Sequence, residues 1–215
     1  MSDAYLFPRA LVIQFAKTPV LGAVKTRMQP YLSEQQSLWL HCRMLEDTYA
    51  RLRSATVAPL ELWISEQDEE RYFQTLKPSP VLRPQIGDDL GERMYSAFID
   101  GLERYRTVVL VGSDCPFLNG EVVSRALGYL EAGYDCVLGP ATDGGYVLMA
   151  LARVVPSLFE GLAWGGSQVL QQTRSRLRDA GFKWSELAPL PDIDCPRDLT
   201  WITPLKQYDK LILSS

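Results

Sequence analysis

The sequence predicts a three-layer α/β/α sandwich with a mixed, mostly parallel β-sheet. Short, nearly continuous apolar segments alternate with amphipathic segments along the whole chain, which is typical of parallel strands covered by helices on both faces. Two of the later strands are joined by a link too short for a crossover helix, which makes the sheet mixed. No repeat, low-complexity tract or linker divides the 215 residues, so residues 1–215 are treated as one domain.

The first half of the chain contains strand and helix patterns in turn. Residues 11–15 read Leu-Val-Ile-Gln-Phe, as expected of a strand that is covered on both faces. Ser33 and Gln36 form a capping-box pattern, and the helix that they open carries an apolar stripe as far as Leu52. The following elements are a strand at 60–64, a charged helix around 67–76, a short strand near 81–82 and an amphipathic helix over about 90–105.

The second half contains the clearest strand signal and the mixed part of the sheet. Residues 108–111 read Val-Val-Leu-Val, a short apolar run typical of a buried strand. Residues 139–145 cannot hold a helical crossover, so one of the two strands that they join is expected to be antiparallel. The later elements are a helix capped by Asn119, strands at 134–138 and 146–151, a helix capped by Ser167 and helical segments after Pro196.

Composition and charge exclude several classes of protein. The 22 basic and 26 acidic residues give a net charge of −4, which disfavours a general nucleic-acid binder. The N-terminus lacks the apolar core of a signal peptide, and no apolar run approaches the ~20 residues that span a bilayer. We therefore expect a cytoplasmic protein without a membrane span, whose oligomeric state, a homodimer among the options, stays open. The cysteines, expected to be reduced thiols without zinc-site spacing, are Cys42, Cys115, Cys136 and Cys195.

The loop after the first strand concentrates positive charge. Ligands of such folds gather outside the carboxyl ends of the strands, so residues there are the first candidates. The loop has neither a Walker A nor a G-x-G-x-x-G pattern, but it contains Lys17, Gly22, Lys25 and Arg27. The backbone at Gly22 can approach a phosphate closely, and Lys25 and Arg27 can neutralise it. A solvated basic loop is an equally good interpretation of these residues.

Two aspartates stand at positions suited to a divalent cation. Asp114 follows the strand at 108–111, and Asp194 lies in the late segment Asp192-Ile-Asp. Mg²⁺ and Mn²⁺ prefer oxygen ligands, commonly one or two carboxylates together with substrate phosphates. Because Asp192 and Asp194 lie two residues apart in an extended segment, we expect only one of them to face the cleft. A turn or helix cap is the alternative role of each aspartate, with Asp194 capping the helix after Pro196.

A glycine turn precedes the strand at 146–151. Gly144 and Gly145 would give a ligand access to backbone amides. Asp143 is a candidate hydrogen-bond acceptor or general base, and Tyr146 is a candidate wall of the site. A simple hairpin turn is the alternative interpretation of the Asp-Gly-Gly sequence.

The entry to the helix at 90–105 is a further glycine-rich segment. Its backbone amides can bind an anion, although its own acidic residues already complement the helix dipole. The candidate site residues there are Gly87, Asp89, Gly91 and Arg93. Trp164 is a candidate wall of an acceptor pocket, and core packing is the more common role of a tryptophan. His41, the single histidine, lies in an amphipathic helix and is expected to be structural.

Taken together, these loops resemble a bacterial family of nucleotide-diphospho-sugar transferases, some of whose members are assigned as glycosyltransferases of arsenosugar biosynthesis. The resemblance implies a GT-A fold, a Rossmann-like sandwich whose nucleotide lies along its N-terminal half. One departure is Trp164-Gly-Gly-Ser, where relatives often have Trp-(Gly/Ser)-Thr. The matching segments span nearly the whole chain in order and are 15–27, 87–94, 112–116, 139–146 and 192–199.

The same segments are similar to those of nucleotidyltransferases with this fold. In the phospholactate guanylyltransferase type, a Lys-Thr-Arg loop and a central-strand aspartate serve nucleotide and metal binding. The late segment of this chain is similar to that of sugar-acid cytidylyltransferases, in which the residue matching Asp194 completes the metal site.

The resemblance implies a metal-dependent glycosyltransferase that uses a nucleoside diphosphate sugar and a small-molecule acceptor. Asp114 and Asp194 would hold Mg²⁺ or Mn²⁺ against the diphosphate, with added positive charge from Lys25 and Arg27. Residues 87–93 would frame the nucleobase or ribose. Two alternatives remain: nucleotidyl transfer from an NTP to a phosphorylated small molecule, and a nucleotide-binding module without turnover. In the transferase, Asp143 would deprotonate the acceptor hydroxyl.

Overall fold

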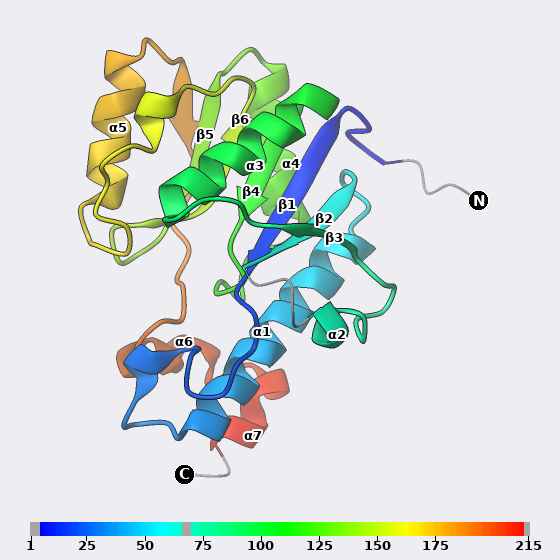
Figure 1. The fold of residues 1–215 in the computed structure, drawn as a ribbon, viewed down its shortest axis with the longest axis vertical. Coiled ribbons are helices and arrows are strands. Elements are labelled where there is room, and N and C mark those ends of the chain that lie inside the picture. The colour runs from blue at the N-terminus through cyan, green and yellow to red at the C-terminus, as the bar shows by residue number, and fades with distance from the viewer. Residues whose placement is uncertain (1–4, 66–69, 213–215) are drawn as a thin grey trace.

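The computed structural model describes residues 5–65 and 70–212, and this part of the chain forms one mixed sheet with helices on both faces (Figure 1). The strands are β1 (Ala10–Ala16), β2 (Leu60–Ile64), β3 (Val81–Pro84), β4 (Thr107–Val111), β5 (Cys136–Pro140), β6 (Tyr146–Leu151) and β7 (Trp184–Glu186). Their order across the sheet is β3-β2-β1-β4-β6-β5-β7. The predicted fold class is therefore confirmed.

The helices begin at the caps that the sequence provides. Ser33 accepts a hydrogen bond from the N–H of Gln36, whose side chain accepts one from the N–H of Ser33, so the predicted capping box is confirmed. Asn119 caps its helix in the same way through Val122. The α-helices are α1 (Glu34–Ser54), α2 (Glu70–Phe73), α3 (Leu90–Arg104), α4 (Gly120–Glu131), α5 (Val169–Asp179), α6 (Leu199–Ile202) and α7 (Asp209–Ile212). Short 3-10 helices are η1 (Thr26–Met28), η3 (Pro156–Leu158), η4 (Pro196–Asp198) and η5 (Lys206–Tyr208).

The sheet is parallel except at β6. β1 pairs in parallel with β2 and β4, β2 with β3, and β5 with β7. β6 runs antiparallel to both of its neighbours, β4 and β5. The expectation of one antiparallel strand is confirmed, because the turn after Pro140 leads straight back into Tyr146. The carboxyl ends of β1, β4 and β5 consequently lie along one edge, where the loops of interest begin.

Two hydrophobic layers enclose the sheet. Leu11 and Ile13 of β1 pack with apolar residues of α3 and α5 on one face. Ala10 and Val12 point to the other face and pack with residues of α4 and the end of α1. Both faces of β1 are thus buried, which explains why its sequence is almost uninterrupted by polar residues.

A smaller hydrophobic cluster lies beyond the carboxyl edge of the sheet, where the start of α1 meets α6 and α7 (Figure 1). Its buried residues come from distant parts of the chain and include Met28, Leu40, Ile193 and Tyr208. This small helical cluster holds the loop after β1 and the segment around residue 193 next to each other.

Several elements differ from the sequence-based expectation. β7 was not predicted, because its three half-buried residues give almost no periodic signal. Gln168 stands at the N-cap position of α5 without a side-chain hydrogen bond, so the predicted cap at Ser167 is wrong. The helix predicted around 67–76 is shorter, since α2 covers Glu70–Phe73, and residues 66–69 lie outside the described residues.

Two further expectations concern the cysteines and the membrane. All four cysteines are free thiols, and Cys115 and Cys136 are buried. Within residues 5–65 and 70–212, no helix has both the length and the apolar character required to cross a lipid bilayer.

Candidate functional site

A cavity of about 300 Å³ opens at the carboxyl edge of the sheet, where β1 and β4 end. Its volume is at the lower end of the range for small-molecule sites. One part of the lining is apolar and another part is acidic. The larger apolar residues are Phe15, Leu90, Met94, Leu110, Val147 and Val169. The charged residues are Arg27, Asp114, Asp143, Asp192 and Asp194.

Asp114 follows β4 and lines this cavity. Its Oδ1 lies 2.7 Å from Nζ of Lys25, while its side chain as a whole is 48% exposed, so the second oxygen is open to the cavity. Burial is the largest effect and opposes ionisation of the carboxyl group, but the charge and hydrogen bond of Lys25, added to contributions from His41 and Lys17, together hold the pKa of Asp114 below its ordinary value. Asp114 is therefore an ionised carboxylate with one oxygen available to a ligand.

The late aspartate segment runs directly beside Asp114. The N–H of Ile193 donates to the carbonyl oxygen of Asp114 at 2.9 Å, and the Ile193 side chain is buried in the small helical cluster. Asp192 and Asp194 both line the cavity, so the expectation that only one would face it is wrong. In an extended segment residues two apart share a face, and the intervening Ile193 occupies the other.

Arg27 and Asp194 form an exposed ion pair at the rim. Nη1 of Arg27 lies 2.6 Å from Oδ2 of Asp194, and the two side chains are 62% and 36% exposed. Asp194 does not cap the following helix: Cys195 is the N-cap residue, and Asp198 reaches back to the N–H groups of Asp194 and Cys195. The carboxylate of Asp194 is consequently free of any capping role.

The glycine turn between β5 and β6 also contributes residues to the cavity wall. Oδ1 of Asp143 accepts a hydrogen bond from the N–H of Gly145 at 2.9 Å, which fixes the carboxylate at the cavity wall. Gly144 has φ +100°, and a Cβ atom there would lie 2.2 Å from the carbonyl oxygen of Ser167. Only glycine allows the turn to approach the 163–167 loop this closely.

Two aromatic residues close the apolar end of the cavity. The rings of Tyr146 and Trp164 meet edge to face, with centroids 6.5 Å apart. Trp164 also packs against α3, where a Cβ atom on Gly91 would lie 2.6 Å from the indole nitrogen. Gly91 therefore gives Trp164 its position, while Tyr146 and Trp164 themselves line the cavity.

A buried polar network behind the site holds the ends of β1 and β4 together. Gln14 Nε2 donates to Oγ of Ser113 at 3.0 Å, and this hydroxyl donates to the carbonyl oxygen of Phe15 at 2.8 Å. His41 is buried, and its Nε2 lies 2.8 Å from the carbonyl oxygen of Lys17. Burial lowers the pKa of His41, as expected of a structural histidine.

The predicted site residues divide into two groups in the structure. Lining the cavity are Arg27, Asp114, Asp143, Gly145, Tyr146, Trp164 and Asp194. The others lie outside that lining: Lys17, Gly22, Lys25, Gly87, Asp89, Gly91, Arg93 and Gly144. Lys17 donates to the carbonyl oxygen of Ala23 within its own loop. Asp89 is the N-cap of α3, and Arg93 donates to the carbonyl oxygen of Gly87.

Negative charge accumulates in the cavity. Burial, and after it the charge of Asp143, raises the pKa of Asp192 to about 6, with smaller contributions from the other two carboxylates. Asp192 was singled out in the sequence only as the neighbour of Asp194, and its facing the cavity could have been inferred from the two-residue periodicity of extended backbone. Arg27 is the one basic side chain among the lining residues.

This donor set fits a hard divalent cation that a ligand helps to hold. Carboxylate oxygens are the ligands that Mg²⁺ and Mn²⁺ prefer, and four aspartates line this cavity. In the part of the chain that the structure describes, no three His, Cys, Asp or Glu side chains converge closely enough to hold a metal ion. A cation here would therefore need phosphate or other ligand oxygens to complete its coordination.

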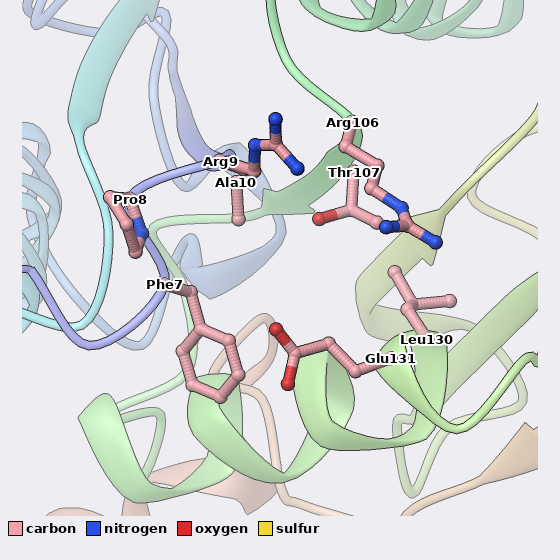
Figure 2. Close-up of a pocket in the computed structure, with 8 residues that line it drawn as sticks. All are labelled: Phe7, Pro8, Arg9, Ala10, Arg106, Thr107, Leu130 and Glu131. Carbon is pink, nitrogen blue, oxygen red and sulfur yellow. The ribbon is translucent and has the colours of Figure 1, made fainter.

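A second cavity, of about 400 Å³, lies at the opposite edge of the sheet, where β1 and β4 begin (Figure 2). Exposed side chains of both charges line it, namely Arg9, Arg106 and Glu131. It contains none of the candidate residues. Because ligands of α/β sheets bind outside the carboxyl ends of the strands, we place the functional site in the first cavity.

Residues 48–166 match the protein family described as "Uncharacterized protein conserved in bacteria (DUF2064)". The chain belongs to this family. A protein from Desulfovibrio desulfuricans G20, assigned as a nucleotide-diphospho-sugar transferase, is 30% identical, and the match covers 97% of this chain and 98% of that one with a TM-score of 0.86. Curated protein sequences give no match.

More distant structures share the fold. CMP:2-keto-3-deoxy-manno-octonic acid synthetase complexed with CTP is 14% identical, with a TM-score of 0.58 over 94% of this chain and 99% of that one. The manganese complex of Rv0371c from Mycobacterium tuberculosis H37Rv is 16% identical, with a TM-score of 0.56 over 91% of this chain and 98% of that one. At these identities the likeness establishes the α/β fold of the chain and nothing finer.

Proposed function

We propose that the chain is a metal-dependent transferase that binds a nucleoside diphosphate sugar at the carboxyl edge of its sheet. One observation carries the proposal: four aspartates surround a single cavity in which Arg27 is the one lining cation. Without a metal ion, these carboxylates would favour a positively charged ligand. A divalent cation bound to them would instead create a site for an anionic diphosphate. The similarity to a protein assigned as a nucleotide-diphospho-sugar transferase supports this choice of ligand.

Asp114 and Asp194 are the residues that would hold Mg²⁺ or Mn²⁺. When bound, the cation would supply Lewis-acid stabilisation of the charge on the departing diphosphate. Asp114 suits this role because its open oxygen is fixed at the end of a central strand. Arg27 is exposed and its ion pair with Asp194 lies at the rim, so it can turn its guanidinium to a ligand phosphate and make a bidentate contact.

Asp143 would accept the proton of the acceptor hydroxyl. Its Oδ1 is fixed by the N–H of Gly145, which leaves Oδ2 free to face a ligand. The carboxylate stands beside the aromatic wall of Tyr146 and Trp164, which would exclude water from one side of the acceptor. Carboxylates in such positions commonly act as general bases.

Nucleotidyl transfer is the second candidate function. The fold is shared with a CTP-bound synthetase and with 4-diphosphocytidyl-2C-methyl-D-erythritol synthases, which favours a nucleoside triphosphate as an alternative ligand. The same cation site and Arg27 would then serve attack on the α-phosphorus of the triphosphate.

Product analysis separates these functions. The protein is incubated with Mn²⁺ and acceptor mixtures, together with either nucleoside diphosphate sugars or nucleoside triphosphates, and the released nucleotide is identified by chromatography and mass spectrometry. Release of a nucleoside diphosphate from one sugar donor supports the glycosyl transferase. Release of pyrophosphate from a nucleoside triphosphate would show nucleotidyl transfer in place of glycosyl transfer. Binding without any product would leave a nucleotide-binding module.

A further inference from the structure

Lys25 lies behind the cavity wall, with its ammonium group enclosed. Only 3% of its side chain is exposed. Nζ lies 2.7 Å from Oδ1 of Asp114 and donates a hydrogen bond of 2.5 Å to the carbonyl oxygen of Ile193. Two of the three ammonium protons are thus committed to acceptors from two distant segments of the chain.

The backbone of Lys25 is unusual as well. Its φ of 50° and ψ of 36° lie in the left-handed region, which residues other than glycine rarely occupy. Such conformations persist where the surrounding structure holds them, and they gather at functional sites. Arg27, two residues further on, is 62% exposed and is paired at the rim with Asp194. Lys25 and Arg27 therefore occupy different environments.

The contacts of Lys25 join the two aspartate-bearing segments of the site. Asp114 and Ile193 are already linked by a backbone hydrogen bond of 2.9 Å. Lys25 adds a second link, from the side chain of Asp114 to the carbonyl group of Ile193. Ile193 stands between Asp192 and Asp194 and is fully buried, so this link sets the position of both cavity-lining carboxylates relative to Asp114.

A phosphate cannot reach the ammonium group of Lys25 in this arrangement. If the side chain moved out to a ligand, Oδ1 of Asp114 would be left buried without its counter-charge. An uncompensated buried carboxylate is strongly unfavourable, so the movement would oppose ligand binding. Arg27 can reach a ligand at no such cost, because Asp194 remains solvated when the pair opens.

We propose that Lys25 is a positioning residue, which holds Asp114 and the 192–194 segment in register and leaves one oxygen of Asp114 for the cation. Arg27, and not Lys25, contacts the phosphate. This inference rests on the proposed function, since it specifies how Asp114 is prepared for the diphosphate and its metal ion. The basic loop and the family resemblance suggest that Lys25 contacts phosphate directly, and the proposed positioning role differs from that expectation.

The first test uses the wild-type protein and needs no knowledge of the ligand. Lysines are reductively methylated with formaldehyde and a borohydride, and the extent at each residue is followed by peptide mass spectrometry. Lys25 should react on the order of tenfold or more slowly than the exposed Lys17, because it must wait for local opening. Lys25 should stay this slow before and after ADP, GDP, UDP or CDP is added, because its ammonium group is enclosed in both states. Rapid methylation of Lys25 in the free protein would overturn the proposal.

The second test compares Lys25→Met with Arg27→Met as the matched control. The dissociation constant of a nucleoside diphosphate that the wild type binds is measured with Mn²⁺ and with EDTA. Lys25→Met should reduce the affinity gained from Mn²⁺ by about tenfold or more and leave affinity in EDTA within about twofold. Arg27→Met should reduce the affinity in EDTA and leave the affinity gained from Mn²⁺ nearly unchanged. Equal losses in EDTA for both variants would show that Lys25 contacts the ligand.

The two tests also separate this inference from the proposed function. If the wild type binds none of the four nucleotides, the proposed function is contradicted, while slow methylation would still show that Lys25 is held within the wall. If Lys25→Met does not fold, the methylation of the wild type decides.

Discussion

Asp192 should make the protein less stable as the pH rises, and replacing it should remove this effect. Burial and the charge of Asp143 raise the pKa of Asp192 to about 6 in the folded protein, from an ordinary value of 3.8. A difference of about two pKa units corresponds to roughly 3 kcal/mol, and contact with water in the cavity reduces this to about 1–2 kcal/mol. Asp192→Asn should therefore increase the free energy of unfolding near pH 7 by that amount.

The sign follows from proton binding. Because the folded protein holds the proton more tightly than the unfolded chain, Asp192 contributes most to stability below pH 4, and that contribution is lost as the pH rises to about 6. The gain from Asp192→Asn should thus be small at pH 4.5 and reach its full value by pH 7. Urea unfolding in EDTA at both pH values measures it. Asp143→Asn, which removes one neighbouring charge, should give part of the same gain. An equal gain at both pH values, or none at pH 7, would show that the charge of Asp192 does not destabilise the folded protein.

Three further predictions concern the turn, the base and the sheet. Gly144→Ala should lower the free energy of unfolding by about 2–4 kcal/mol, because its Cβ atom would meet the carbonyl oxygen of Ser167. The control Gly161→Ala should lower it by only about 1 kcal/mol, because Gly161 has φ +63° but no atom within 4 Å of the added Cβ. Thermal unfolding compares the two variants. Asp143→Asn should lower kcat by about 10²–10⁴-fold with KM for the donor little changed, and an unchanged kcat would exclude it as the base. Glu61→Gln should cost about 2 kcal/mol in urea unfolding, because the Glu61 carboxylate is buried and accepts from Arg104 at 2.6 and 3.0 Å; a neutral result would show that the pair contributes little.

The sequence predicts most of the sheet because its strands are buried on both faces. β1 and β4 appear as short apolar runs for this reason, and the alternation of such runs with amphipathic segments predicts the α/β class. The antiparallel β6 could also be inferred, from the shortness of the turn before it. β7 could not, because a three-residue edge strand with half-buried side chains has no pattern of its own.

The candidate site was predictable in its carboxylates and less so in its cations. Asp114 was singled out because it follows a central strand, Asp143 because it lies in a glycine turn, and Asp194 because of its acidic late segment and the family resemblance; all three line the cavity. Asp192 was missed because Asp192 and Asp194 were expected to face opposite sides. The periodicity of extended backbone in fact places residues two apart on the same face. The burial of Lys25 depends on Ile193, which is 168 residues away in the sequence, and no local pattern reveals such a contact.

The small helical cluster explains why that contact exists. Met28 and Ile193 are both buried in it, so the loop after β1 and the late aspartate segment fold against each other. Two of its helices, α6 and α7, have only four residues each, which makes them hard to predict in detail from periodicity. Long-range packing of this kind, and not the local sequence, decides which charged residues face the cavity and which are enclosed behind it.

Metal-dependent nucleotide binding at Asp114 is measured by calorimetric titration of nucleoside diphosphate sugars and nucleoside triphosphates into wild type and Asp114→Asn, each with Mn²⁺ and with EDTA. Thermal unfolding without ligand first confirms that the variant is folded. We predict that at least one nucleotide binds the wild type in Mn²⁺, and that its affinity falls by about 100-fold or more in EDTA or in Asp114→Asn. Binding that is equally tight without the metal and without Asp114, or no binding of any nucleotide at millimolar concentration, would contradict it.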